Sequence, residues 1–186
     1  MTTDELIARI KGSDEAARAD AWMNAGPLGA PAIQPLAGPM GDSDTETRRA
    51  ATRACQRIVR HAGRPGAKDE AAAVTRELLA VLKSQTHPGV RREVIWMLSE
   101  IAGSEAVMPL AALLSNEELR EHARAALERI PGPESVGALK AILPGAPADY
   151  KPAIAQSLRA RGVEVEGVEC IKLKPTKQTE VKPVGR

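Results

Sequence analysis

The sequence contains very few aromatic residues: no phenylalanine, one tyrosine and two tryptophans among 186 residues. Hydrophobic residues nevertheless make up 43% of the chain, and they are almost entirely alanine, leucine, isoleucine and valine. Aromatic residues favour strands, whereas alanine and leucine favour helices. We therefore expect an all-α fold whose small side chains let the helices approach closely.

The sequence also has only two cysteines and no long apolar run. Cys55 and Cys170 lie far apart in unlike contexts, which excludes a disulfide framework and indicates a reducing compartment. No apolar run approaches the roughly 20 residues that cross a bilayer, and the start of the chain is acidic where a secretory signal is basic. We expect a cytoplasmic protein that does not enter a membrane.

Net charge is only +2, so the whole-chain balance argues neither for nor against a nucleic-acid partner. Any electrostatic argument must rest on a local cluster of charge.

One pattern recurs five times when the chain is aligned with itself. The repeats are spaced by roughly 30 residues, with one longer interval, and the aligned positions are Ala17, Thr47, Val90, Leu119 and Tyr150. A basic residue follows each aligned position: Arg18, Arg48, Arg91, Arg120 and Lys151. Apolar residues stand four and eight positions later, which places them on one side of an α-helix. Each unit therefore contains an amphipathic helix with one buried stripe.

Helix starts and ends are also marked. Asp14, Asp44 and Asn116 stand three residues before an aligned position, where such side chains cap a helix. A second helix per unit is predicted between the joints, which are rich in glycine and proline, over residues 30–40, 71–83, 105–114 and 134–143. Each unit is then helix, turn, helix, turn, and buries its apolar face only against its neighbours.

These helices resemble a known repeat. Residues 44–55, 90–98 and 119–130 look like the second helix of HEAT repeats, especially the short bacterial subclass named after phycobilisome lyases. The resemblance covers residues 1–162 and implies a right-handed α-α superhelix, an α-solenoid of about five repeats whose second helices line the concave side. It implies no catalytic residues, because the pattern is a packing signature.

Two segments depart from the pattern. About 13 extra residues around 61–73 predict a longer loop and an added helical turn. After Gly162 the composition changes, so residues 163–186 are expected to form a tail outside the solenoid, with an edge strand or an extended cap to about Leu173 and disorder beyond it.

A basic patch is the strongest candidate for binding. Arg49, Arg53, Arg57 and Arg60 share the face of one helix that points away from the buried stripe. On a concave layer of second helices, a contiguous patch would consist of Met23, Arg49, Arg53, Arg57, Arg92 and Trp96. Arginine and tryptophan anchor many interfaces, so the leading hypothesis is an interaction module or scaffold for a protein or peptide.

Three other interpretations stay open. The arginines form a solvated face neutralised by acids of neighbouring first helices, while Trp96 plugs an alanine-lined gap and Trp22 packs in the core. Alternatively, the patch binds a phosphate backbone, although few aromatic side chains are available for stacking. An enzyme resembling a bilin lyase or a DNA glycosylase is the third, and a glycosylase would need Glu100 beside Trp96.

Little in the sequence supports catalysis. Cys55 falls on the buried stripe, and no catalytic partner stands near Cys170. His61, His87 and His122 belong to different units and none pairs with another at the spacing of metal ligands. We therefore expect no enzyme activity, metal or cofactor; the partner's identity and the oligomeric state stay open.

Overall fold

The computed structural model describes residues 1–84 and 87–170. These residues form ten α-helices and three short 3-10 helices, and no strand. The α-helices are α1 (Thr3–Lys11), α2 (Glu15–Met23), α3 (Ile33–Met40), α4 (Thr45–Ala62), α5 (Lys68–Lys83), α6 (Pro88–Ile101), α7 (Val107–Ala111), α8 (Arg120–Arg129), α9 (Pro133–Ile142) and α10 (Lys151–Ala160). The predicted all-α fold is confirmed.

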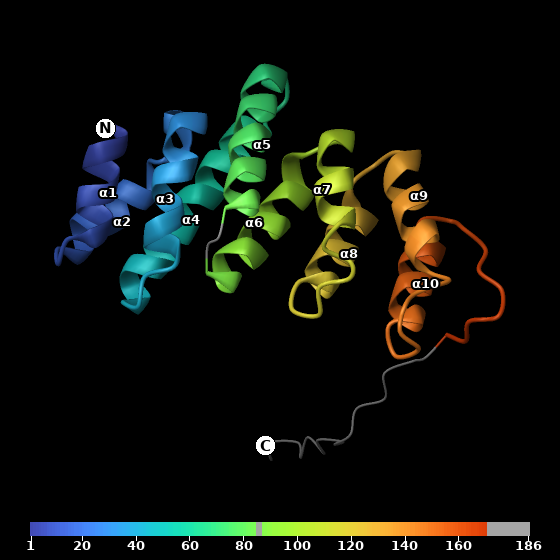
Figure 1. Ribbon diagram of the computed structural model, residues 1–186. Helices are drawn as coiled ribbons and strands as arrows, with labels where there is room; N and C mark the ends of the chain where they lie inside the picture. The colour runs from blue at the N-terminus through green and yellow to red at the C-terminus, as the bar shows by residue number, and fades with distance from the viewer. Residues whose placement is uncertain (85–86, 171–186) are drawn as a thin grey trace, which may run out of the picture.

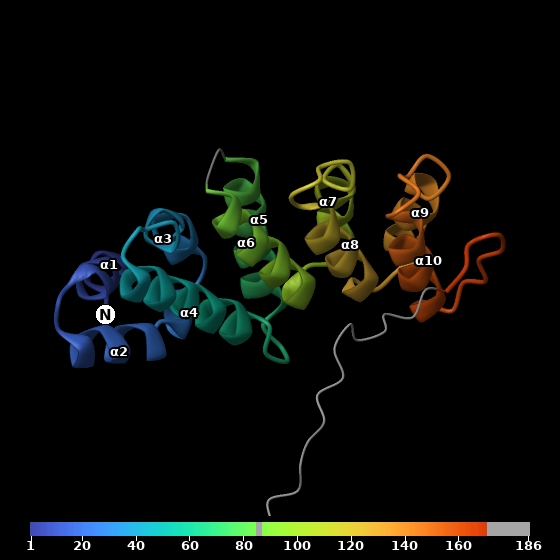
Figure 2. The same ribbon diagram turned by 90° about the horizontal axis from the view of Figure 1, so that it is seen from below.

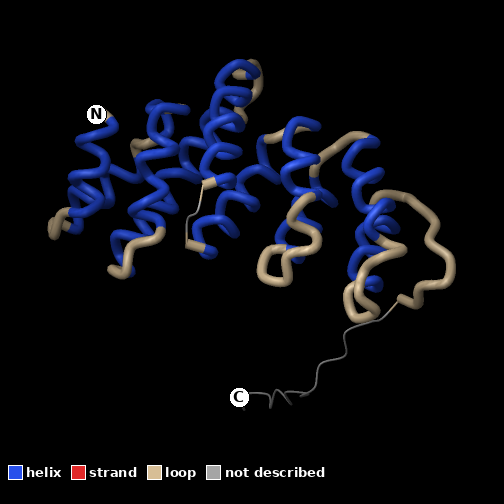
Figure 3. The backbone as a smooth tube through the Cα atoms, viewed as in Figure 1, coloured by secondary structure: helices blue, strands red, loops and turns tan. Residues whose placement is uncertain are grey.

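The helices stack as five antiparallel pairs in two layers (Figure 1). One layer contains α1, α3, α5, α7 and α9, and the other contains α2, α4, α6, α8 and α10. Seen from below, the stack is curved and the second helices lie along its inner side (Figure 2). Loops are confined to the joints and to the segment after α10 (Figure 3). This arrangement is an α-solenoid.

Short polar side chains start several of the second helices, as the sequence predicted. Asp14 accepts hydrogen bonds from the Ala16 and Ala17 amides at the start of α2. Asp44 accepts from the Thr47 amide at 2.8 Å, and this bond holds the pKa of its carboxyl below the usual range. Asn116 instead caps the turn before α8, since it accepts from the Leu119 amide and the helix begins one residue later.

The predicted apolar stripe is buried in every pair. Val94, Leu98 and Leu127 are at most 1% exposed, and the equivalent positions of the other second helices lie in the same continuous core. Ala17 is the weak member and is half-buried, as suits the outer edge of a terminal repeat. The stripe therefore joins each helix pair to the pairs before and after it.

The recurring basic position has a structural role in the first two pairs. Arg18 donates to the carbonyl of Ile10 at 3.2 Å, and Arg48 donates to the carbonyl of Asp42 at 2.7 Å. The Ile10 carbonyl lies in the last turn of α1 and the Asp42 carbonyl lies after α3, and helical partners are lacking at both places. These arginines therefore close turns and are not part of the candidate patch.

The extra residues of the second unit are mostly helical. They extend α4 to Ala62 and start α5 at Lys68, so that α4 has 18 residues and α5 has 16. The loop between them is short and is held by an ion pair of 2.6 Å between Arg64 and Glu70. The insertion thus adds helix length more than loop length, contrary to the longer loop that the sequence suggested.

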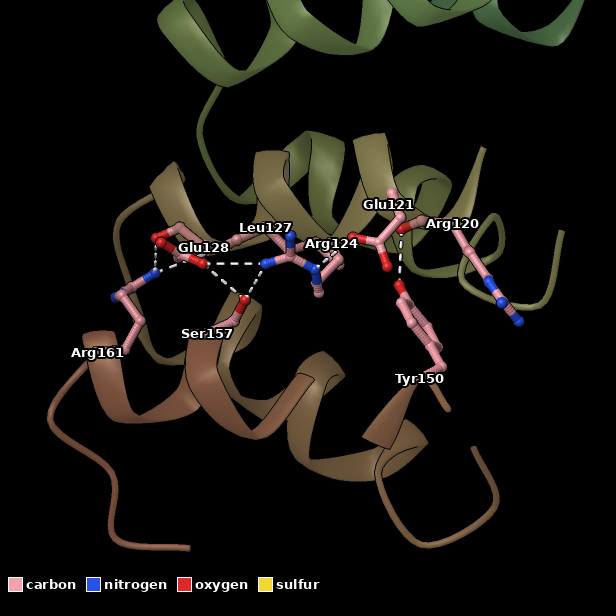
Figure 4. A network of polar contacts seen from close by, with 8 residues as sticks. All are labelled: Arg120, Glu121, Arg124, Leu127, Glu128, Tyr150, Ser157 and Arg161. Carbon is pink, nitrogen blue, oxygen red and sulfur yellow. Dashed lines mark hydrogen bonds and ion pairs between the residues drawn. The ribbon is translucent and has the colours of Figure 1, made fainter. Parts of the chain in front are cut away.

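Polar contacts join α8 to the last helix, α10 (Figure 4). The buried Tyr150 hydroxyl donates to the Arg120 carbonyl at 2.7 Å, and the Ser157 hydroxyl donates to Glu128 at 2.6 Å. Arg161 donates to three carbonyls at the end of α8, including that of Ile130 at 2.7 Å. Hydrogen bonds therefore supplement the apolar packing of α10 on α8 at the C-terminal end of the stack.

Residues 163–170 cover that end as an extended segment. Val163 and Val165 pack on the core, and Arg159 donates to the carbonyls of Val165 and Val168. The sequence predicted either an edge strand or an extended cap here, and residues 163–170 form no strand. The predicted disorder falls on 171–186, outside the described residues.

Candidate functional site

The structure places all six predicted patch residues on the layer of second helices. Met23 is the last residue of α2, Arg49, Arg53 and Arg57 lie on α4, and Arg92 and Trp96 lie on α6. Met23 and Trp96 are 49% and 46% exposed, far more than other large apolar residues of these helices. Because α2 packs on α4 and α4 packs on α6, the six residues come from adjacent helices.

Trp22 also belongs to this surface, which the sequence did not predict. Its ring is half-buried against the core, but its other side carries two guanidinium groups. The Cζ atoms of Arg53 and Arg57 lie 5.2 Å and 5.7 Å from the ring centroid, within the range of cation–π attraction. Trp22 therefore packs on the core and also supports the guanidinium groups of Arg53 and Arg57.

The Trp96 side chain is exposed and does not fill a gap. The Cζ atom of Arg129, from α8, lies 4.5 Å from the centroid of its ring. Beside it a hollow of ≈ 340 Å³ is lined by Trp96, Ser99, Glu121, His122, Arg124, Ala125 and Ala126. The alanine-lined gap exists, but Trp96 forms its wall, so the prediction that this side chain plugs it is wrong.

Acids of the first helices do not neutralise the arginines. Arg49 pairs with Glu46 of its own helix at 3.1 Å, and Arg92 pairs with Glu118, just before α8, at 2.7 Å. Arg53, Arg57 and Arg60 make no ion pair or side-chain hydrogen bond with any other described residue. The donors of these three arginines therefore face solvent.

Hollows connect the patch across helices. One of ≈ 460 Å³ between α4 and α6 is lined in part by Arg49, Arg53 and Glu93. Another, of ≈ 520 Å³, joins Gln56 of α4 to Arg92 and Trp96 of α6 and to His122 of α8. We call the surface formed by Trp22, Met23, Arg49, Arg53, Arg57, Arg60, Arg92, Trp96 and Arg129 the inner patch.

Comparison with known proteins gives the repeat type. Residues 75–159 match the family model of HEAT repeats. This part of the chain consists of HEAT-like repeats. The match spans the helices from α5 to α10, which include two of the three segments on which the resemblance was based.

Two solved structures of engineered proteins are also similar to this HEAT-like chain. One is 19% identical, covers 85% of this chain and 78% of its own, and has a TM-score of 0.43. The other is 18% identical, covers 85% and 80%, and has a TM-score of 0.46. No curated protein matches the chain.

Cys55 and Glu100, two groups weighed for catalysis from the sequence, both lie among the described residues. Burial raises the pKa of the Cys55 thiol to about 12, so the nucleophilic thiolate does not form near neutral pH. Glu100 lines a hollow with Arg60 and Arg129, whereas Trp96 lines two others. Glu100 and Trp96 therefore do not line the same hollow, although Glu93 and Glu121 each share a hollow with Trp96.

Two further kinds of feature are absent from the described residues. No group of three or more histidine, cysteine or acidic side chains is placed to hold a metal ion. No described helix is both long and apolar enough to cross a membrane.

Proposed function

We propose that this HEAT-like chain is a protein-interaction module that binds a partner protein or peptide through the inner patch. HEAT repeats are generally scaffolds for protein interactions, and the proposal assigns that role to one face of this chain. The observation that carries it is the pair of exposed stacks, Arg53 and Arg57 on Trp22 and Arg129 on Trp96, beside open hollows.

The stacks suit recognition for a physical reason. A guanidinium group that rests on a ring loses little further side-chain freedom on binding, and its hydrogen-bond donors still point outward. Tryptophan and arginine also contribute more binding energy than most residues in protein interfaces. The inner patch therefore concentrates side chains that are already arranged for contact.

The test is affinity capture from cells of the source organism, with and without nuclease. The double variant Arg53→Glu, Trp96→Ala removes one arginine on α4 and the exposed ring on α6. It leaves the core intact. Arg76→Glu is the matched control, because Arg76 is an exposed arginine on α5, in the other layer. We expect the double variant to lose the captured protein and the control to keep it, with circular dichroism unchanged in both.

Either of two results would remove the proposal. Equal capture by the wild type and the double variant would place the interface elsewhere. Capture that disappears after nuclease treatment would instead show that a nucleic acid is the ligand of the arginines on α4.

A further inference from the structure

The charge of the inner patch changes along the stack. At the α4 end, Arg53, Arg57 and Arg60 carry positive charge with no acidic partner among the described residues. Arginine binds carboxylates through two parallel hydrogen bonds, and it does so most strongly where the guanidinium is held in place. The stack on Trp22 supplies that restraint, so this end is suited to carboxylate groups.

The α6–α8 end has a different character. Its hollow of ≈ 340 Å³ is mostly apolar, with the ring of Trp96 on one side and Ala125 and Ala126 on the other. This volume is at the lower limit of ligand pockets, which suits one apolar side chain. The Arg129 guanidinium lies over the Trp96 ring, and the hollow beside the ring is open in the unbound chain.

Acidic side chains separate these two ends. Glu93 lines the hollows beside α4 and Trp96, Glu100 lies beside Arg60 and Arg129, and Glu121 lines the apolar hollow. Arg92 and Arg129 lie among these acids, so the surface over α6 and α8 is mixed in charge, and a ligand with negative charge along its whole length, such as a nucleic acid, would gain less there than over α4. We therefore expect the negative charge of the ligand to be concentrated near α4.

We infer that the occupant of the inner patch is an extended acidic peptide segment with a single apolar anchor residue. Its carboxylates contact the arginines of α4, and its anchor side chain enters the hollow between Trp96 and Ala125. This inference rests on the proposed function and specifies the chemistry of the partner.

The spacing of the helices fixes the length of the segment. Packed helices lie about 8–10 Å apart, so about 20 Å separates α4 from α8. An extended chain advances about 3.3 Å per residue, and about six residues therefore join the first carboxylate to the anchor. The hollow that joins Gln56, Trp96 and His122 lies along this route.

Synthetic peptides test the inference directly. The probe has a run of glutamates, a short glycine spacer and one leucine, and it is made in both orders because either chain direction is compatible with the surface. Binding is read from the fluorescence of Trp96 in the Trp22→Phe variant, in which Trp96 is the only tryptophan and the arginines keep an aromatic ring to rest on. We expect one order to change the fluorescence saturably.

Matched variants separate the two halves. Replacing the peptide leucine with serine should weaken binding about tenfold, as loss of a partly buried leucine implies. Ala125→Leu should weaken the leucine peptide similarly by filling the hollow, and should leave the serine peptide unaffected. Replacing the glutamates with glutamines should abolish the decrease in affinity with added salt, and Arg53→Glu in the protein should reduce it, because Arg57 and Arg60 remain.

Three results would overturn the inference: no binding in either order, no effect of the leucine, or tighter binding of an oligothymidylate than of the acidic peptide. If the peptides fail while capture of the natural partner still depends on Arg53 and Trp96, only the peptide chemistry is wrong. If that capture is also independent of both residues, the proposed function fails as well.

Discussion

Every aromatic residue of the chain carries a guanidinium group over its ring. Arg53 and Arg57 lie over Trp22, Arg129 lies over Trp96, and Arg120 lies over Tyr150 at 4.6 Å. Tyr150 is buried, and its stack joins two helices within the fold. The tryptophans are partly exposed. The arginines stacked on Trp22 and Trp96 therefore present hydrogen-bond donors to solvent, whereas the stack on Tyr150 stabilises the contact between two helices.

Truncation of a core residue should cost far more stability than truncation of an exposed one. Leu98 is 0% exposed and joins α6 to the common core, whereas Met108 on α7 is 76% exposed. Leu98→Ala should lower the free energy of unfolding by about 2–5 kcal/mol because it leaves a cavity. Met108→Ala should change it by less than about 0.5 kcal/mol in the same urea titration. Similar losses in both variants would contradict the buried stripe.

The two cysteines should differ sharply in reactivity. Cys55 is buried with its pKa raised to about 12, so its thiol stays protonated in the folded chain below that pH. Cys170 is exposed. Iodoacetamide at pH 8 should therefore label one cysteine in the native protein and both in urea, as mass spectrometry would count them. The Cys170→Ser variant should take up no label until it unfolds, and rapid native labelling of it would show that α4 opens.

The sequence predicted the buried residues better than the partners of the exposed ones. Val94 and Leu98 follow from the spacing within one helix, which a single segment reveals. The contact of Arg53 with Trp22 joins two helices of different units, and no pattern within either helix encodes it. Arg129 could have been found, because it stands ten residues after Leu119 as Arg57 stands ten residues after Thr47.

Among the helices, α4 determines most of the inner patch. Its 18 residues are bounded by the cap at Asp44 and by Ala62, and the extra length brings Arg60 to the hollow that contains Glu100 and Arg129. The insertion in the second unit therefore extends the charged surface.

Two glycines near the start of α9 should respond in opposite ways to alanine. Gly137 lies exposed inside the helix with nothing near its missing Cβ, so Gly137→Ala should stabilise the chain by about 0.5–1 kcal/mol. Gly132 precedes the helix at φ 106° and ψ 162°, a region that is almost restricted to glycine and costs alanine about 1–3 kcal/mol. Thermal melting should rise for the first variant and fall for the second; the same sign for both would contradict this local backbone.

Helix starts were predictable where a capping side chain is adjacent to the helix. Asp14 and Asp44 identify the starts of α2 and α4 correctly. At α8 the cap residue Asn116 is separated from the helix by a turn, so the helix begins later than its spacing suggested. Asn116 therefore marks the turn that leads into α8, and its position alone does not give the first helical residue.

At the scale of the whole molecule, stability comes from contacts between neighbouring pairs. Each second helix packs on the second helices before and after it, so the inner layer is one continuous surface and not five separate ones. The repeat spacing predicted this architecture. It did not predict the change from basic to mixed charge along the inner layer, which depends on side chains of α4, α6 and α8 meeting in shared hollows.

Amide hydrogen exchange with and without the captured partner tests the central claim most directly. Binding through the inner patch predicts slower exchange in α4, α6 and the facing part of α8. The first helices α1, α3, α5, α7 and α9 should keep the exchange rates of the unbound chain. Protection confined to those first helices, with α4 and α6 unchanged, would contradict the account.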